Sequence, residues 1–207
     1  VHDGSGNMLL EAQGSYGVGG MSETWGAQLF RYTDCDLGVM GNWPVDAAAL
    51  QPYYADLEEH IGFSGVHDDM DGFFGPVEKL LPPTPLVPAA AYLLKNYERA
   101  TSVGRKGPGI TLGHARLAVL TREYEGRLPH TFGETEFFTT SQQGLYTAKC
   151  TLEELRRRGR HTYLGGHRLT GWKETPDYVE ITVINAKEGT QRTLRTRHLL
   201  LGCGVIH

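Results

Sequence analysis

The chain has 207 residues, of which 40% are hydrophobic and 21% charged, and its formal net charge at pH 7 is −4. This composition is typical of globular proteins, and the length allows one or two domains with a real core. The small negative charge gives no reason to expect a nucleic acid or an anionic membrane as partner, and no apolar run approaches the roughly 20 residues that span a bilayer.

Residues 14–32 combine a cluster of glycines with one large aromatic side chain, Trp25. Glycine has no Cβ, so such a segment can adopt left-handed conformations, lie against a flat ligand and point its N–H groups at phosphate or ring acceptors. A flexible linker is the alternative, but Met21, Leu29 and Phe30 in the same run argue against it. The glycines are Gly14, Gly17, Gly19, Gly20 and Gly26.

Two short helices are expected after this segment. Asp46 suits the N-cap of a helix through Leu50, and Pro52 suits the first position of a second helix over residues 53–61. Apolar residues in 53–61 recur at spacings near three and four, and Gly62 stands where a C-cap glycine belongs.

Loops dominate the next part of the chain. Residues 63–88 are rich in Gly, Pro and Asp and predict a loop, followed by a helix over 89–100 with Leu93, Leu94 and Tyr97 facing inward. Residues 113–128 could form a strand or a short helix, and 129–144 a loop with an edge strand.

A capping box, Thr151-x-x-Glu154, predicts the start of another helix that ends at Gly159. Arginines 156–158 fill its last turn, where cations complement the helix dipole, so they need no nucleic acid to explain them.

The last third of the chain predicts β structure. Residues 178–184 alternate between apolar and polar, 185–189 form a turn, and 190–197 pair back. Residues 198–201 are a continuous apolar run, which suits a strand buried on both faces of a parallel sheet. A β-meander in any α/β protein would show the same pattern.

Cysteine and histidine spacing predicts no metal site. Cys35, Cys150 and Cys203 are far apart and form neither a disulfide framework nor a CxxC pair, so reduced thiols are expected. The nine histidines show no HExxH spacing.

The run Gly19-Gly20-Met21-Ser22, followed by Trp25, resembles the flavin-facing segment of the glucose–methanol–choline (GMC) oxidoreductase family, and is most similar to its pyranose-oxidase branch. The resemblance extends to later positions in the chain, namely Trp43-Pro44, Leu50, Pro52-Tyr53-Tyr54, Glu58 and Gly202-Cys203-Gly204.

This resemblance implies an α/β fold, α+β in part. It would be a partial FAD/NAD(P)-binding dinucleotide fold with an antiparallel β-meander and part of a substrate-binding domain. Residues 1–62 would be the flavin-facing part of the FAD-binding domain and 63–144 a loop-rich substrate-side segment. Residues 145–207 would supply the helix, meander and buried strand of the FAD-binding domain.

The implied activity is that of an FAD-dependent oxidoreductase, which oxidises a CH–OH group of a sugar or alcohol by hydride transfer to flavin. Oxygen, a quinone or a haem protein would reoxidise the flavin. Covalent pyranose oxidases carry a histidine directly before the tryptophan; Thr24 stands there, so FAD is expected to be non-covalent. The implied cofactor-binding residues are Gly19, Gly20, Met21, Ser22, Thr24, Trp25, Gly26, Leu169, Gly202 and Gly204.

The sequence departs from the family pattern at both ends. The family's GxGxxG pyrophosphate loop has no counterpart, and its catalytic histidine is expected C-terminal to this chain, so His207 is not assigned that role. We therefore expect an internal fragment that has no catalytic residue of its own and is inactive alone.

Two other classes stay open. One is another flavoprotein or NAD-type oxidoreductase with two dinucleotide folds, since fold does not fix function. The other is a non-enzymatic carbohydrate-binding domain, in which aromatic residues stack on sugar rings. The candidates for that role are Tyr16, Trp25, Tyr32, Trp43, Tyr53 and Tyr54.

Overall fold

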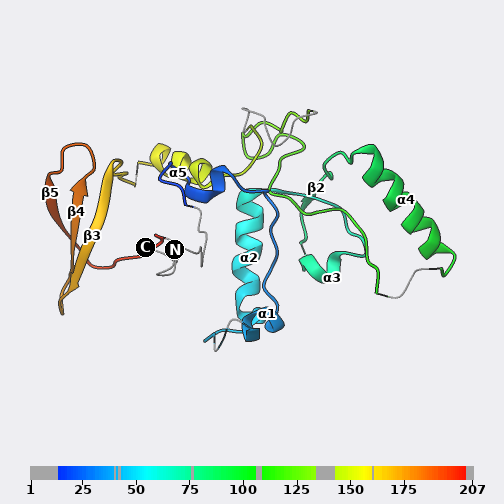
Figure 1. The fold of residues 1–207 in the computed structure, drawn as a ribbon, viewed down its shortest axis with the longest axis horizontal. Coiled ribbons are helices and arrows are strands. Elements are labelled where there is room, and N and C mark those ends of the chain that lie inside the picture. Colours follow the sequence, from blue (N-terminus) through cyan, green and yellow to red (C-terminus); the bar gives the residue numbers. More distant parts are fainter. Residues whose placement is uncertain are drawn as a thin grey trace, which may run out of the picture. The chain divides into compact units, whose positions relative to one another are not determined.

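The computed structural model describes residues 14–39, 41, 43–75, 77–105, 109–133, 143–159 and 161–203. They form a mixed α/β structure with a three-stranded antiparallel sheet and a two-stranded parallel sheet (Figure 1). One compact unit holds the described residues up to Gly20 together with those from Lys149 onward, and the other holds Met21–Ala148. Within the described residues, no helix has the length and apolar character needed to cross a membrane.

The second unit contains most of the helices. Its two-stranded sheet pairs β1 (Phe63–Ser64) in parallel with β2 (Leu80–Leu81). A short 3-10 helix, Gly20–Glu23, leads into this unit from the glycine segment. The α-helices are α1 (Asp34–Val39), α2 (Ala47–Ile61), α3 (Asp71–Phe74) and α4 (Pro88–Ser102).

Helix α2 has the predicted caps but not the predicted break. The Asp46 side chain accepts a hydrogen bond from the Ala49 N–H at 2.8 Å, and the Gly62 N–H donates to the Glu58 carbonyl. The expectation of two helices separated at Pro52 is wrong, because α2 runs through this proline. Proline removes one intrahelical hydrogen bond near the start of the helix, and the buried contacts of Ile61 further along hold the continuous helix in place.

The core of this unit is built from segments that are distant in sequence. Ala27, Ile61, Phe63, Ala118 and Val119 form its buried cluster. Residues 113–128 thread through it as extended chain rather than as a regular strand or helix. Their backbone reaches several neighbours in turn, through isolated bridges that join Leu117 to Gln28 and to Ser64, and Val119 to Leu145. The loop and edge strand expected over 129–144 fall largely outside the described residues.

Helix α4 confirms the predicted helix but not all of its inner face. Leu94 and Tyr97 are partly buried, whereas Leu93 is 61% exposed, so the expectation for Leu93 is wrong. The inward stripe runs through Ala90, Leu94 and Tyr97 at helical spacing, which places Leu93 one 100° step off it. The Tyr97 hydroxyl donates to Asp69 Oδ2 at 2.5 Å.

Helix α5 (Ala148–Arg157) begins three residues before the predicted capping box. Thr151 and Glu154 therefore lie inside the helix, and the predicted start is wrong. The Ala148 N–H instead donates to Ser22 Oγ at 2.9 Å. Ser22 is 126 residues away in the sequence, so local spacing could not reveal this cap. Arginines 156 and 157 occupy the last turn as expected.

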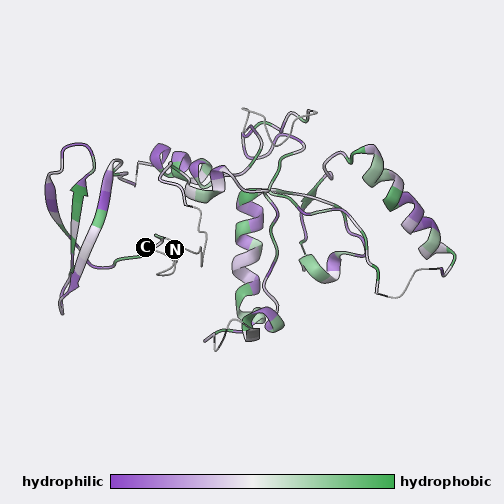
Figure 2. Ribbon diagram, in the orientation of Figure 1, coloured by the Kyte–Doolittle hydropathy of each residue, from purple (hydrophilic) through white to green (hydrophobic). Residues whose placement is uncertain are grey.

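The meander is confirmed. Strands β3 (His167–Glu174), β4 (Val179–Asn185) and β5 (Gln191–Thr196) pair antiparallel in that order, with an irregularity in β3 between Leu169 and Gly171. Figure 2 shows β4 as the most hydrophobic of the three strands, and within β4 Val183 is buried.

The buried strand expected over 198–201 is wrong. These residues form no strand, and Leu200 is 95% exposed. An apolar run becomes a central strand only where neighbouring strands and helices cover it. In the described part of the chain, β5 pairs with β4 alone and no strand lies beside 198–201.

Candidate functional site

The glycine segment forms a tight turn that requires glycine. The Gly20 N–H donates to the Gly17 carbonyl at 2.9 Å, and two successive residues, Gly19 and Gly20, have φ of +100° and +58°. Side chains strongly disfavour these conformations. Two of the five glycines of the segment, Gly19 and Gly20, thus use the left-handed conformations that the sequence allows, and they lead directly into the 3-10 helix.

The surface above the turn is open. A Cβ built on Gly20 or on Gly26 would meet no heavy atom within 4 Å. Met21 and Thr24 are exposed beside them, and the Thr24 hydroxyl donates only to the Met21 carbonyl, at 3.4 Å. A side chain at either glycine would therefore meet open space.

Trp25 and Ser22, which follow the turn, are held within the second unit. The Trp25 indole Nε1 donates to the Tyr146 carbonyl at 2.9 Å, and its ring packs against the buried cluster. Ser22 accepts from Ala148, as described above. Both residues were expected to contact a cofactor, and both have structural roles that the sequence does not indicate.

The other residues expected at the site belong to different parts of the chain. Leu169 lies in β3 opposite Val183, and Gly202 follows β5 in extended, exposed chain. Both are in the unit that contains the meander, whereas Met21–Gly26 are in the other. Gly204 lies outside the described residues.

A buried ion pair that the sequence analysis missed links the glycine segment to α2. Arg31 donates from Nε to Glu58 Oε1 at 2.8 Å and from Nη2 to Glu58 Oε2 at 2.5 Å, and it also bonds Gln51. Both charged side chains are almost completely buried. A bidentate pair of this kind fixes orientation as well as distance. The sequence carries no local signal for this pair, because its two residues are 27 positions apart.

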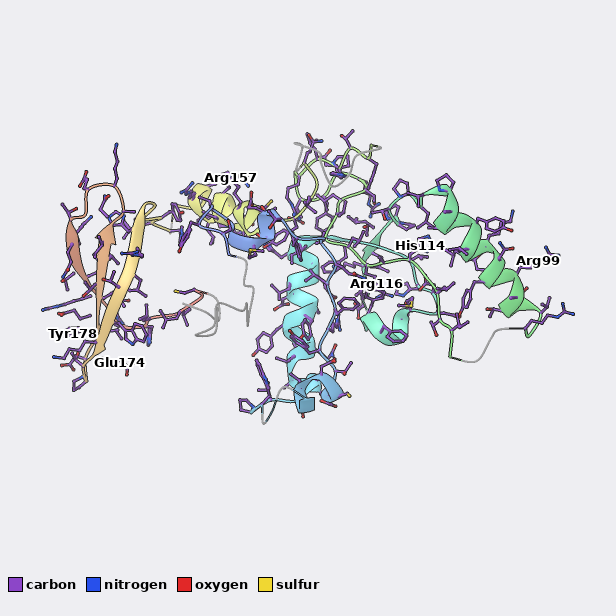
Figure 3. The ribbon with its side chains drawn as sticks, viewed as in Figure 1. Arg99, His114, Arg116, Arg157, Glu174 and Tyr178 are labelled. Carbon is purple, nitrogen blue, oxygen red and sulfur yellow. The ribbon has the colours of Figure 1, made fainter. Side chains whose placement is uncertain are left out.

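A second buried arginine, Arg116, lies beside α3 (Figure 3). It is 1% exposed, donates to the Gly75 carbonyl at 2.8 Å and pairs with Asp71. Burial pushes the pKa of Asp71 upward, but hydrogen bonds from His67 and the Asp68 backbone, with the charge of Arg116, outweigh it. The pKa of this carboxyl is therefore below its ordinary value.

The loop before α3 is hydrogen-bonded to the extended segment that carries Arg116. Asp68 accepts the Met70 N–H at Oδ1 and the His114 N–H at Oδ2, at 2.9 and 2.7 Å. His114 Nδ1 lies 3.5 Å from the same Oδ2 atom. Among the described residues, no group of three His, Cys, Asp or Glu side chains could hold a metal ion.

Comparison with protein-family models gives no match for this chain, and comparison with curated proteins gives none either.

Proposed function

We propose that this protein is part of an FAD-dependent oxidoreductase of the GMC type, which oxidises a CH–OH group of a sugar or alcohol. The observation that carries the proposal is the turn at Gly19 and Gly20. Its two left-handed glycines and the uncrowded Cβ position of Gly20 suit a backbone that holds a flat cofactor. The resemblance of Gly19–Ser22 and Trp25 to the family's flavin-facing segment supports the same proposal.

The residues present fit a flavin at this turn. The absence of a Cβ at Gly20 and Gly26 leaves room for a ring system against the main chain. Met21 and Thr24 would border it, and Trp25 would hold the turn in place. Bound FAD supplies the acceptor for a hydride from the carbon that bears the hydroxyl group. The chain's own part is to bind and orient the ring.

The proposal extends to the fold. The β3–β5 meander would belong to an FAD/NAD(P)-binding dinucleotide domain, with the Leu169 backbone near the adenine and Gly202 and Gly204 near the cofactor. Residues 63–144 would form part of the substrate-binding domain. We assign no general base within this chain.

The decisive experiment replaces Gly20 with valine in the full-length protein. A branched side chain on the open face of the turn should exclude the ring, so the purified variant should lose its flavin absorbance. Gly104→Val is the matched control, because Gly104 also has a positive φ and an unobstructed Cβ position but lies after α4. Both variants carry similar backbone strain. Full flavin occupancy in Gly20→Val would overturn the proposal, provided that circular dichroism shows both variants folded.

The same protein tests the mode of attachment. Thr24 has no nucleophilic nitrogen, so acid precipitation should release free FAD into the supernatant. Flavin that remains with the precipitate would contradict the assignment of Thr24 to the position before the tryptophan.

Exposed aromatic side chains support carbohydrate binding as a second candidate. Tyr32, Trp43 and Tyr53 are each at least half exposed, as stacking on sugar rings requires. Trp25 is anchored in the core and is a poorer candidate for such stacking. Saturable sugar binding by purified protein that lacks both flavin and oxidase or dehydrogenase activity would favour this class. Bound flavin that does not depend on residues 19–26 would favour another class of flavoprotein.

A further inference from the structure

An apolar cavity of about 110 Å³ lies in the second unit, between α2, α3 and the segment that follows the glycine turn. Leu29, Leu57, Ile61, Phe63 and Val77 contribute to its walls. The walls are mostly apolar, Arg31, Glu58 and Arg116 also line them, and the cavity opens to the surface. An apolar cavity of similar volume can take up a molecule such as benzene, so this one is large enough for a single ring.

The two arginines at this cavity are already neutralised. Arg31 pairs with Glu58, and Arg116 pairs with Asp71. An anionic ligand would add a negative charge beside the Glu58 carboxylate, and a cationic ligand would meet two guanidinium groups. Because transferring a charge into an apolar site without a free counter-charge is costly, the pairing favours a neutral ligand.

Aromatic rings next to the cavity favour a ligand that is itself aromatic. Phe30 and Phe74 stack with centroids 5.1 Å apart and planes 6° apart, and Arg116 covers Phe74 at 5.5 Å. Phe74 is buried in this stack, whereas Phe30 is 55% exposed and has ring surface to spare. Offset stacking and the attraction between a guanidinium and a ring face both select for aromatic over aliphatic ligands.

We propose that this cavity is a binding site for a small, uncharged, single-ring aromatic molecule. The site is independent of the glycine turn, and every residue that forms it belongs to the second unit. Leu57, which is 53% exposed, lies where the cavity meets the surface, so a larger side chain there should close the entrance.

The test titrates the full-length protein with fluorobenzene, followed by ¹⁹F NMR, alongside 4-fluorobenzoate and 4-fluorobenzylamine. We expect saturable fluorobenzene binding and affinities at least about tenfold weaker for the two charged probes. Absence of saturable fluorobenzene binding would overturn the proposal. Tighter binding of 4-fluorobenzoate would overturn it too, because it would mean that the arginine charges are available to a ligand.

Two variants locate the binding. Leu57→Trp should weaken fluorobenzene binding by at least about tenfold by filling the entrance, and Phe30→Ala should weaken it by removing the stacked ring. Both replaced side chains are about half exposed, so both variants are expected to fold. The matched control is Leu93→Trp, which places the same large ring on the exposed flank of α4 and should leave binding unchanged. Equal affinities in Leu57→Trp and the wild-type protein would place the probe elsewhere and refute the site.

Discussion

The indole nitrogen of Trp25 and the carbonyl oxygen of Tyr146 are joined by a hydrogen bond of 2.9 Å that spans 121 residues of sequence. Three residues before Trp25, Ser22 caps the first N–H of α5. Residues 22–25 are therefore fixed at two points to the stretch around residues 146–148.

Trp25→Phe should destabilise the protein by about 1–2 kcal/mol. The phenyl ring keeps most of the apolar packing, but the donor to the Tyr146 carbonyl is lost. Urea unfolding measures the effect. Trp43→Phe is the control, because Trp43 is half exposed, and its loss should stay within about 0.5 kcal/mol. Equal losses in the two variants would show that the hydrogen bond contributes nothing specific.

Glu58→Gln should cost about 3 kcal/mol or more, because it leaves the Arg31 guanidinium buried without a counter-charge. The double variant Arg31→Met/Glu58→Leu should lose less than the sum of its single substitutions. Glu59→Gln is a neighbouring control on the same helix. Its partner Lys79 and Glu59 itself are exposed, so the loss should be at most about 1 kcal/mol. Additive losses at Arg31 and Glu58 would contradict a coupled buried pair.

Elements whose signals are local were predictable from the sequence. The alternation in β4 gave the meander, and Asp46 and Gly62 marked the two ends of α2, because capping and pleating depend on neighbouring residues. Predictions failed where a distant partner decides the outcome. Ser22 moves the start of α5, and tertiary packing overrides the helix-breaking tendency of Pro52.

The site was predictable only in part, for the same reason. Glycine clustering indicated that left-handed conformations were possible here, because glycine alone adopts a positive φ at little cost, but not that Gly19 and Gly20 would be the residues to use them. The pairing of Arg31 with Glu58 and of Arg116 with Asp71 could not be derived, since the partners are 27 and 45 residues apart in the sequence. Residue type gave no sign that these charges are buried.

Gly144→Ala should be strongly destabilising. Its φ is +74°, and a Cβ there would lie 2.1 Å from the backbone nitrogen of His130, which cannot move without breaking its hydrogen bond to Leu120. Gly126→Ala is the matched control, with φ of +71° and nothing within 4 Å of the added atom. The control should lose only about 1 kcal/mol from backbone strain. Similar melting temperatures for the two variants would contradict the clash.

The contribution of ionised Asp71 to the free energy of unfolding should disappear in acid. Its pKa is lowered in the folded protein, so its stabilising effect is complete above the ordinary aspartate value, roughly 4, and is lost as the pH falls through the folded value. Asp71→Asn should therefore be less stable than the wild-type protein at neutral pH, and the difference should shrink as the pH falls below about 4. Urea unfolding across this range measures both proteins. A difference that stays constant would show that the Asp71 charge is not involved.

The order in which the core is assembled has a consequence for synthesis in the cell. The Ala118 N–H donates to the Ala27 carbonyl, and the backbones of Ser64 and Leu117 donate to each other. The Trp25 indole N–H has the Tyr146 carbonyl as its acceptor. A chain that leaves the ribosome can form α2 and α4 early, but its core cannot close until Tyr146 has emerged, on the order of ten seconds after Trp25 at ordinary elongation rates. During that interval Ala27, Ile61 and Phe63 lack the partners Ala118 and Val119 that cover them in the folded protein.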